Sequence, residues 1–436
     1  MLNIIPNQGK YKFLTTVLFL FIAITLGLNN IVVGVKVFGV SIDKLFGLFC
    51  FLLLSKSFFH DFKYNKYFRK INMIFVGFLL LKILKTESLL LQNESMESGL
   101  ILMDMAKNIF FIMYFYLAYF LSTRYVDGYK IIILVLFLGF VLAFFQHPLT
   151  PLTSETMDFK LEYFSGNLLK GGSEKLEDAI NYGYEVTRVS GPYGYSITLS
   201  YVLITAAIIT IRLYLKENSL KYIALFIFIF FISLLSLTRS VILSMLILSF
   251  YLIYYFLKGR GSSITKVLGL LLLSFFSVTL LSYFIIGNDP FMRVFSFNDS
   301  SANARLPLLL TGIIAVIENP LGVPTAAYME VKDLMYMTYQ NHHILTKTSH
   351  NGIINIGFEY TFLGYFLFAF FIMETRSHLI GIDKVKRTFW LCALFSYFTH
   401  VMFHNEMMFI SDYHSLLFLA LLASETNNGK KELCRI

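Results

Sequence analysis

The sequence is poor in charged residues, which make up only 14% of its 436 positions. A soluble domain carries roughly 25%, because it must cover its core with side chains that water solvates. Three cysteines exclude a disulfide-rich scaffold, and 17% aromatic residues exclude a disordered chain. Since 57% of the residues are hydrophobic, the remaining class is a polytopic membrane protein whose apolar surface faces lipid.

Hydropathy over windows of about 19 residues predicts twelve transmembrane helices in an all-α fold. The predicted spans are 13–33, 38–58, 72–92, 100–122, 130–147, 192–214, 220–237, 239–257, 266–287, 351–373, 388–404 and 407–424. The first lacks a small-x-small cleavage site, so we expect an uncleaved span and not a signal peptide. Asp104 and Lys107 interrupt the fourth span, and their spacing allows them to pair on one helix face.

The net charge is +9, and the Lys and Arg residues stand in short clusters between the apolar runs. This is the positive-inside pattern of membrane proteins, and it argues against a nucleic-acid partner. With both termini in the cytoplasm, every inner connection is basic. Residues 1–436 then form a single membrane domain with two long extracytoplasmic loops, 148–190 and 288–350. Long polar loops on one face are commonly functional, so we expect the site at the outer face.

Four short motifs in or beside these loops contain residues suited to chemistry. The first is Arg188 to Gly194, before the sixth span, and the second is Thr238-Arg239, in a tight outer turn. In the third, Arg305 opens an amphipathic helix that leads to Asn319-Pro-Leu-Gly-Val323. The fourth is His350-Asn351, followed by Glu359 and Gly364. In the predicted topology all four lie at the outer face.

In this order the motifs resemble those of the bacterial O-antigen ligase and polymerase superfamily, over the part of the chain from Arg188 to Gly364. Thr361 departs from the pattern, because the family usually has glycine there. The resemblance implies a GT-C-like ligase and polymerase architecture in the bacterial cytoplasmic (inner) membrane. It also implies a Wzy-like glycosyltransferase that joins repeat units into O-antigen, capsular or exopolysaccharide. The partners implied are an undecaprenyl-pyrophosphate-linked oligosaccharide and membrane lipid, together with a flippase and a chain-length regulator of the same pathway.

The chemistry of these residues suits such a donor. Arginine stays charged and binds phosphate oxygens in pairs, so Arg239 and Arg305 are candidates to stabilise the departing pyrophosphate. His350 is the candidate base that takes the proton from the acceptor hydroxyl. The candidate substrate-binding residues are Arg188, Tyr193, Asn351 and Glu359. An arginine at a helix end can equally be an anchor to lipid phosphates.

A metal site is not expected, and neither is any other cofactor. His400 and His404 share a helix face and Asp412 follows, but the metalloprotease motif HExxH is absent. We therefore expect His404 and its neighbours to lie in the last outer turn, where they contact water.

Two alternatives remain open. The first is an O-antigen ligase, which would transfer finished polysaccharide to lipid A core. The two long outer loops and the basic C-terminal tail favour a polymerase over a ligase but do not decide between them. A flippase or another transporter would place polar pairs at the membrane midplane between two similar halves. The sequence contains no such internal repeat.

Overall fold

The computed structural model describes residues 20–23, 25–26, 36–37, 40–92, 98–124, 128–146, 189, 191–193, 196–236, 238–258 and 303–425. These residues are almost entirely helical. Three helical stretches are long and apolar enough to cross a membrane: Asp104–Arg124, Ser196–Glu217 and Arg239–Leu257. The bent pair Lys44–Leu53 and Ser55–Tyr64 raises that number to four if it forms one span. The protein is a helical membrane protein, and twelve spans remain a prediction.

The N-terminal part begins with a short hairpin of β1 (Lys36–Val37) and β2 (Val40–Ser41), paired antiparallel. Its helices are α2 (Ile42–Leu53), α3 (Ser55–Tyr64), α4 (Lys66–Leu91), α5 (Ser98–Arg124) and α6 (Gly128–Gln146). Asn65 caps α4 by accepting a hydrogen bond from Phe68 N. Asp104 and Lys107 form the predicted pair on α5, at 2.8 Å.

The middle and C-terminal parts continue with the 3₁₀ turn η1 (Gly191–Tyr193), α9 (Ser196–Glu217), α10 (Leu220–Leu235), α11 (Arg239–Leu257), α15 (Arg305–Glu318), α16 (Thr325–Tyr339), α17 (His343–Thr346), α18 (Gly352–Tyr360), α19 (Gly364–Ile380), α20 (Lys384–Val401) and α21 (Ser415–Ser424). Helices therefore begin at Arg239 and at Arg305, as the sequence predicts. The predicted span 266–287 lies outside the described residues, and so does the predicted loop 148–190 apart from Val189.

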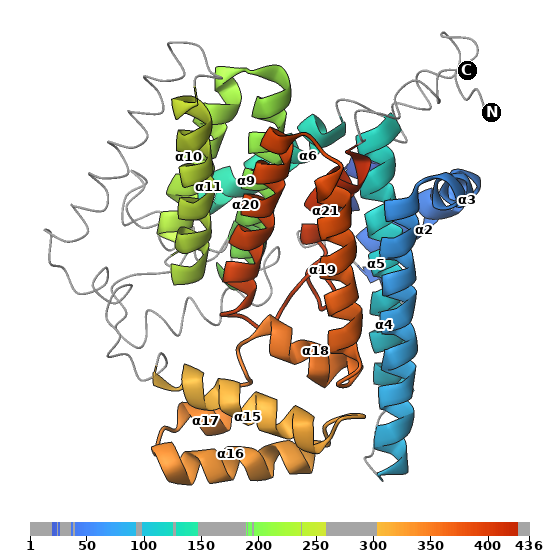
Figure 1. The fold of residues 1–436 in the computed structure, drawn as a ribbon, viewed down its shortest axis with the longest axis vertical. Coiled ribbons are helices and arrows are strands. Elements are labelled where there is room, and N and C mark those ends of the chain that lie inside the picture. The colour runs from blue at the N-terminus through green and yellow to red at the C-terminus, as the bar shows by residue number, and fades with distance from the viewer. Residues whose placement is uncertain are drawn as a thin grey trace, which may run out of the picture.

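The long helices run side by side, while α15, α16 and α17 lie across one end of the bundle (Figure 1). We call this end the capped end. Within the bundle, α21 packs against α5 and α9, and α20 packs against α11. Helix α18 links the two layers, because it contacts α15 on one side and α4 and α19 on the other.

Two predicted spans are not continuous helices. The span 38–58 bends by 69° between α2 and α3, at Leu54. The span 351–373 is interrupted after Tyr360, because Thr361 has φ 67° and Phe362 N donates a hydrogen bond to Pro320 O. Backbone at such a φ cannot continue a right-handed helix. The chain consequently turns between α18 and α19.

The predicted span 407–424 is also shorter than expected, since α21 begins only at Ser415. Met407 and Ile410 instead form a tight turn with reciprocal backbone hydrogen bonds, and Ser411 follows with φ 61°. This turn inserts Phe409 into the core, 4.8 Å from the ring of Phe78. Residues 402–414 are therefore an irregular segment folded back into the bundle.

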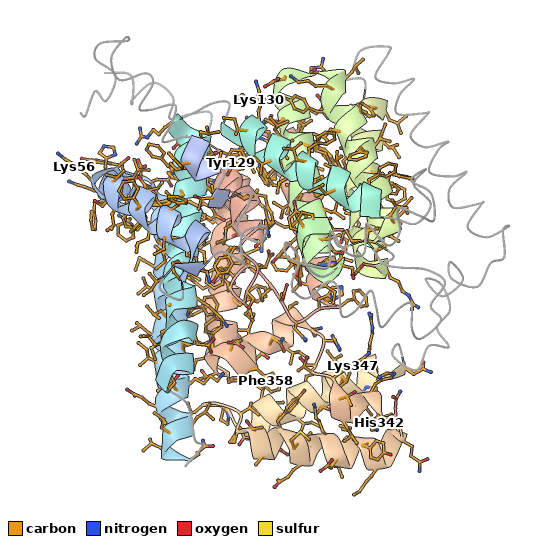
Figure 2. The ribbon with its side chains drawn as sticks, turned by 180° about the vertical axis from the view of Figure 1, so that it is seen from behind. Lys56, Tyr129, Lys130, His342, Lys347 and Phe358 are labelled. Atoms are coloured by element: carbon orange, nitrogen blue, oxygen red, sulfur yellow. The ribbon has the colours of Figure 1, made fainter. Side chains whose placement is uncertain are left out.

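The opposite end of the bundle is rich in ion pairs. Arg124 binds Asp61 at 2.7 Å, Lys130 binds Glu217 at 2.8 Å, and the buried Glu425 binds Arg212 and Lys386. Figure 2 shows Lys130 at this end and His342 and Lys347 at the capped end.

Candidate functional site

The candidate site is built around Met402–Glu406, the segment that follows α20 at the capped end. Asn351 Nδ2 donates a hydrogen bond to Met402 O at 3.2 Å, and Asn355 Nδ2 donates one to Asn405 O at 2.8 Å. The backbone of Gly352 lies so close that a Cβ there would be 2.7 Å from Glu406 O. The start of α18 is thereby fixed against this segment.

Arg305 reaches the same segment from α15. Its Cζ lies 5.1 Å from the centroid of the Phe403 ring, a cation–π geometry that orients the guanidinium without neutralising it. Arg305 is only partly buried. A guanidinium held in this way can still offer its N–H groups to an anion.

His350 lies within the electrostatic influence of Arg305. Burial lowers the pKa of His350 to about 4, with the positive charges of Lys347 and Arg305 contributing. The imidazole is therefore neutral at pH 7, which a proton acceptor requires, but it is a weak base in the free protein. An anion bound beside it would raise this pKa by offsetting the two cations.

The backbone of His350 is also unusual, with φ 47°. Non-glycine residues adopt this left-handed conformation rarely, and such strain is concentrated at functional sites. Asn351, which follows, caps α18 by accepting hydrogen bonds from Ile353 N and Ile354 N. The His-Asn motif thus combines a strained turn with a helix cap, and Asn351 has a structural role whether or not it contacts substrate.

The third element at the site is the start of α11. Arg239 is the first residue of this helix and is partly buried. Ser240, next to it, contacts His404 Nε2 at 2.8 Å and His400 Nδ1 at 3.0 Å. Since His404 follows Phe403, the helix with Arg239 and the segment under Arg305 are directly joined. The structure therefore brings together elements carrying Arg239, Arg305, His350 and Asn351.

Glu359 does not share these contacts. It pairs with the buried Lys82 of α4, which also binds Asp104 at 3.1 Å. Lys107 completes the group through Asp104. Glu359 thus belongs to an ion-pair network between α18, α4 and α5.

Tyr193 is buried in η1 against α6, where its hydroxyl occupies the space that a Cβ at Gly139 would need. That hydroxyl has no hydrogen-bond partner among the described residues. The Tyr193 ring meets His414 edge-on, 6.2 Å between centroids. Arg188 lies outside the described residues.

The expectation that His404 contacts water was wrong, because its exposed fraction is 7%. His400 is 0% exposed. They are buried because the start of α11 covers them through Ser240. Asp412, the third member of the metal pattern, accepts a hydrogen bond from Tyr397 at 2.7 Å. Among the described residues, no three His, Cys, Asp or Glu side chains are placed to hold a metal ion.

Sequence reasoning missed Ser240, Phe403 and His404 as parts of the site. The available signals were the position of Ser240 directly after Arg239 and the i,i+4 spacing of the two histidines. Neither signal identifies a partner, because the partners come from distant parts of the chain.

Comparisons with protein-family models, with curated proteins and with solved structures found no match for this chain.

Proposed function

We propose that this protein is a metal-independent glycosyltransferase that polymerises oligosaccharide repeat units carried on undecaprenyl pyrophosphate. The reaction takes place at the capped end, at the outer face of the bacterial cytoplasmic membrane. The products are O-antigen, capsular or exopolysaccharide chains. The proposal follows from the sequence resemblance and is supported by the arrangement of the candidate site.

The observation that carries the proposal is the convergence of Arg305, His350 and the start of α11 on Met402–Glu406. These elements are far apart in the sequence. Two arginines and a neutral imidazole are the groups needed to hold a pyrophosphate leaving group and to accept one proton. Their position at one end of the bundle suits a donor whose lipid tail stays in the membrane.

The proposed step is a single displacement. The acceptor hydroxyl oxygen forms a bond to the anomeric carbon of the donor glycan, while the bond from that carbon to the pyrophosphate oxygen breaks. The electron pair leaves with the pyrophosphate, where Arg239 and Arg305 stabilise the added negative charge. The hydroxyl proton passes to His350, whose basicity increases once the anionic donor is bound.

We further propose twelve spans with both termini in the cytoplasm. The ion-pair end supports this orientation, because Lys56, Lys130 and Lys386 lie in or beside connections that the positive-inside rule assigns to the cytoplasm. The capped end would then face outward.

The location of the site favours an enzyme over a transporter. A transporter typically binds its substrate near the membrane midplane, between broken helices. Here the candidate arginines start α11 and α15 at the capped end. A ligase would use the same donor chemistry with a different acceptor, so the two enzymes differ in product.

Deletion of the gene in its native cells distinguishes these functions. A missing polymerase leaves single lipid-linked repeat units on the outer leaflet, and the wild-type gene restores long chains. A missing ligase leaves full-length polymer on its lipid carrier, whereas a missing flippase leaves single units on the cytoplasmic leaflet. Either of the last two results would overturn the proposal.

A further inference from the structure

One buried hydroxyl at the candidate site lies between two imidazoles. Ser240 Oγ is 2.8 Å from His404 Nε2 and 3.0 Å from His400 Nδ1. All three side chains belong to residues no more than 7% exposed. Buried polar groups of this kind cost free energy unless they are paired, so their contacts constrain the surrounding backbone strongly.

The proton positions in this group follow from counting donors. Ser240 has one hydroxyl proton, so it donates to one imidazole and accepts from the other. Among the described residues, His400 Nε2 has no hydrogen-bond partner, and an unpaired lone pair is tolerated better than an unpaired N–H. His400 Nδ1–H therefore donates to Ser240, and Ser240 donates to His404 Nε2.

This hydrogen bond connects the two arginine-bearing parts of the site. Ser240 directly follows Arg239 in the first turn of α11. His404 directly follows Phe403, on whose ring the Arg305 guanidinium lies. A shift of α11 along its axis would change the position of Arg239 relative to Arg305, and the Ser240–His404 bond opposes that shift.

We propose that Ser240 and His404 are positioning residues that hold Arg239 and Arg305 at the spacing that recognises a lipid diphosphate in preference to a lipid monophosphate. The inference rests on the proposed function and specifies how the site selects its donor. A monophosphate can be bound by either guanidinium alone, whereas a diphosphate gains from both only when their spacing is fixed.

The chain contains a matched control one helical turn further along α11. Ser244 Oγ donates a hydrogen bond to Ser396 O at 2.7 Å, and Ser396 Oγ donates one to Ser244 O at 2.9 Å. Ser244 is buried at the same α11–α20 contact, and its hydrogen bonds among the described residues go to Ser396 and not to residues 402–406. Its removal weakens helix packing without touching the bond under test.

The experiment measures the Kd of undecaprenyl pyrophosphate and of undecaprenyl phosphate for the full-length protein in nanodiscs. We expect the wild type to prefer the diphosphate, and Ser240→Ala and His404→Ala to reduce this preference about tenfold, the typical effect of losing a buried hydrogen bond. Ser240→Thr and His404→Gln can keep the bond and should retain the preference. Ser244→Ala should retain it as well. Unchanged binding of the monophosphate shows that each variant is folded.

The outcomes separate the inference from the proposed function. A wild-type protein without preference for the diphosphate would overturn both. If Arg305→Ala abolishes the preference but Ser240→Ala keeps it, only the positioning role is wrong. The positioning role is equally wrong if Ser244→Ala reduces the preference as much as Ser240→Ala, because general packing would then explain the effect.

Discussion

Arg305 lies over the aromatic ring of Phe403, with its Cζ 5.1 Å from the ring centroid. The contact joins the helical layer across the capped end to the irregular segment that follows α20. It places a cation beside the segment that Ser240 and Asn351 also contact. The predictions below test what this arrangement does.

Arg305→Ala should lower the rate of polymerisation by about 10- to 100-fold, since a charge-assisted contact to the leaving group is lost. Arg305→Lys should recover only part of it, because an ammonium lacks the bidentate fork. Chain-length distribution on gels, with protein level as the control, measures both. Equal, full activity of the two variants would reduce Arg305 to a lipid anchor.

His350→Ala should lower the polymerisation rate at least 100-fold if the imidazole is the base. His350→Gln should fail nearly as badly, because its amide can hydrogen-bond to a sugar but cannot accept the proton. Single lipid-linked units should accumulate in both strains. If instead both retain about a tenth of the activity, His350 positions the acceptor; normal chain lengths would remove it from the site.

The pH dependence should reflect the lowered pKa of His350. The neutral base predominates above about pH 4 in the free protein, so kcat/KM should be flat near neutral pH and fall as the pH approaches 4. Lys347→Gln removes a nearby positive charge, which raises the pKa of His350 and moves this acid limb to higher pH. An acid limb at the same pH in both proteins would show that another group titrates.

The Lys82 network should act on stability. Lys82→Met leaves the carboxylates of Glu359 and Asp104 without their shared cation, which should lower the free energy of unfolding by roughly 2–3 kcal/mol. The double variant Lys82→Met/Glu359→Leu should regain part of this loss, because one unpaired charge is removed as well. Thermal unfolding in detergent measures the effect. A normal unfolding temperature with lost donor binding would instead support Glu359 as a substrate-binding residue.

Thr361 offers a test of the break between α18 and α19. Its φ of 67° favours glycine, so Thr361→Gly should raise the free energy of unfolding by about 1 kcal/mol. Thr361→Val keeps the strain and loses the hydroxyl that accepts a hydrogen bond from Leu363 N, and should be less stable than the wild type. If the helix were continuous across this position, Thr361→Gly would be less stable than the wild type and Thr361→Val would not.

Helix starts at the site could be predicted from the sequence, but helix interruptions could not. Arg239 and Arg305 begin helices as expected. Arg239 lies in a short polar break between two apolar runs, and Arg305 stands between a polar stretch and an apolar run. The break at Thr361 has no proline or glycine at the residue that turns, so no local signal marks it. The irregular segment before α21 mixes apolar residues with His404, Glu406 and Asp412, and only the tertiary packing of Phe409 reveals its turn.

The candidate site shows the same limit. The residue types alone suggested the arginines and His350 as site residues, because the chemistry of a guanidinium or an imidazole can be inferred without knowing its neighbours. The burial of His400 and His404 depends on α11, a helix that is distant in sequence. The same sequence pattern is therefore compatible with a polar turn in water and with a buried hydrogen-bonded group. Burial of such groups is a tertiary property.

Photocrosslinking from position 403 tests the central claim most directly, because it asks what occupies the site. A benzophenone amino acid replaces Phe403 in the native cells, and the same substitution at Phe395, an exposed position of α20, serves as the control. We predict that mass spectrometry finds a lipid diphosphate carrying an oligosaccharide attached at position 403, and only bulk phospholipid at position 395. The same bulk phospholipids at both positions would contradict the account.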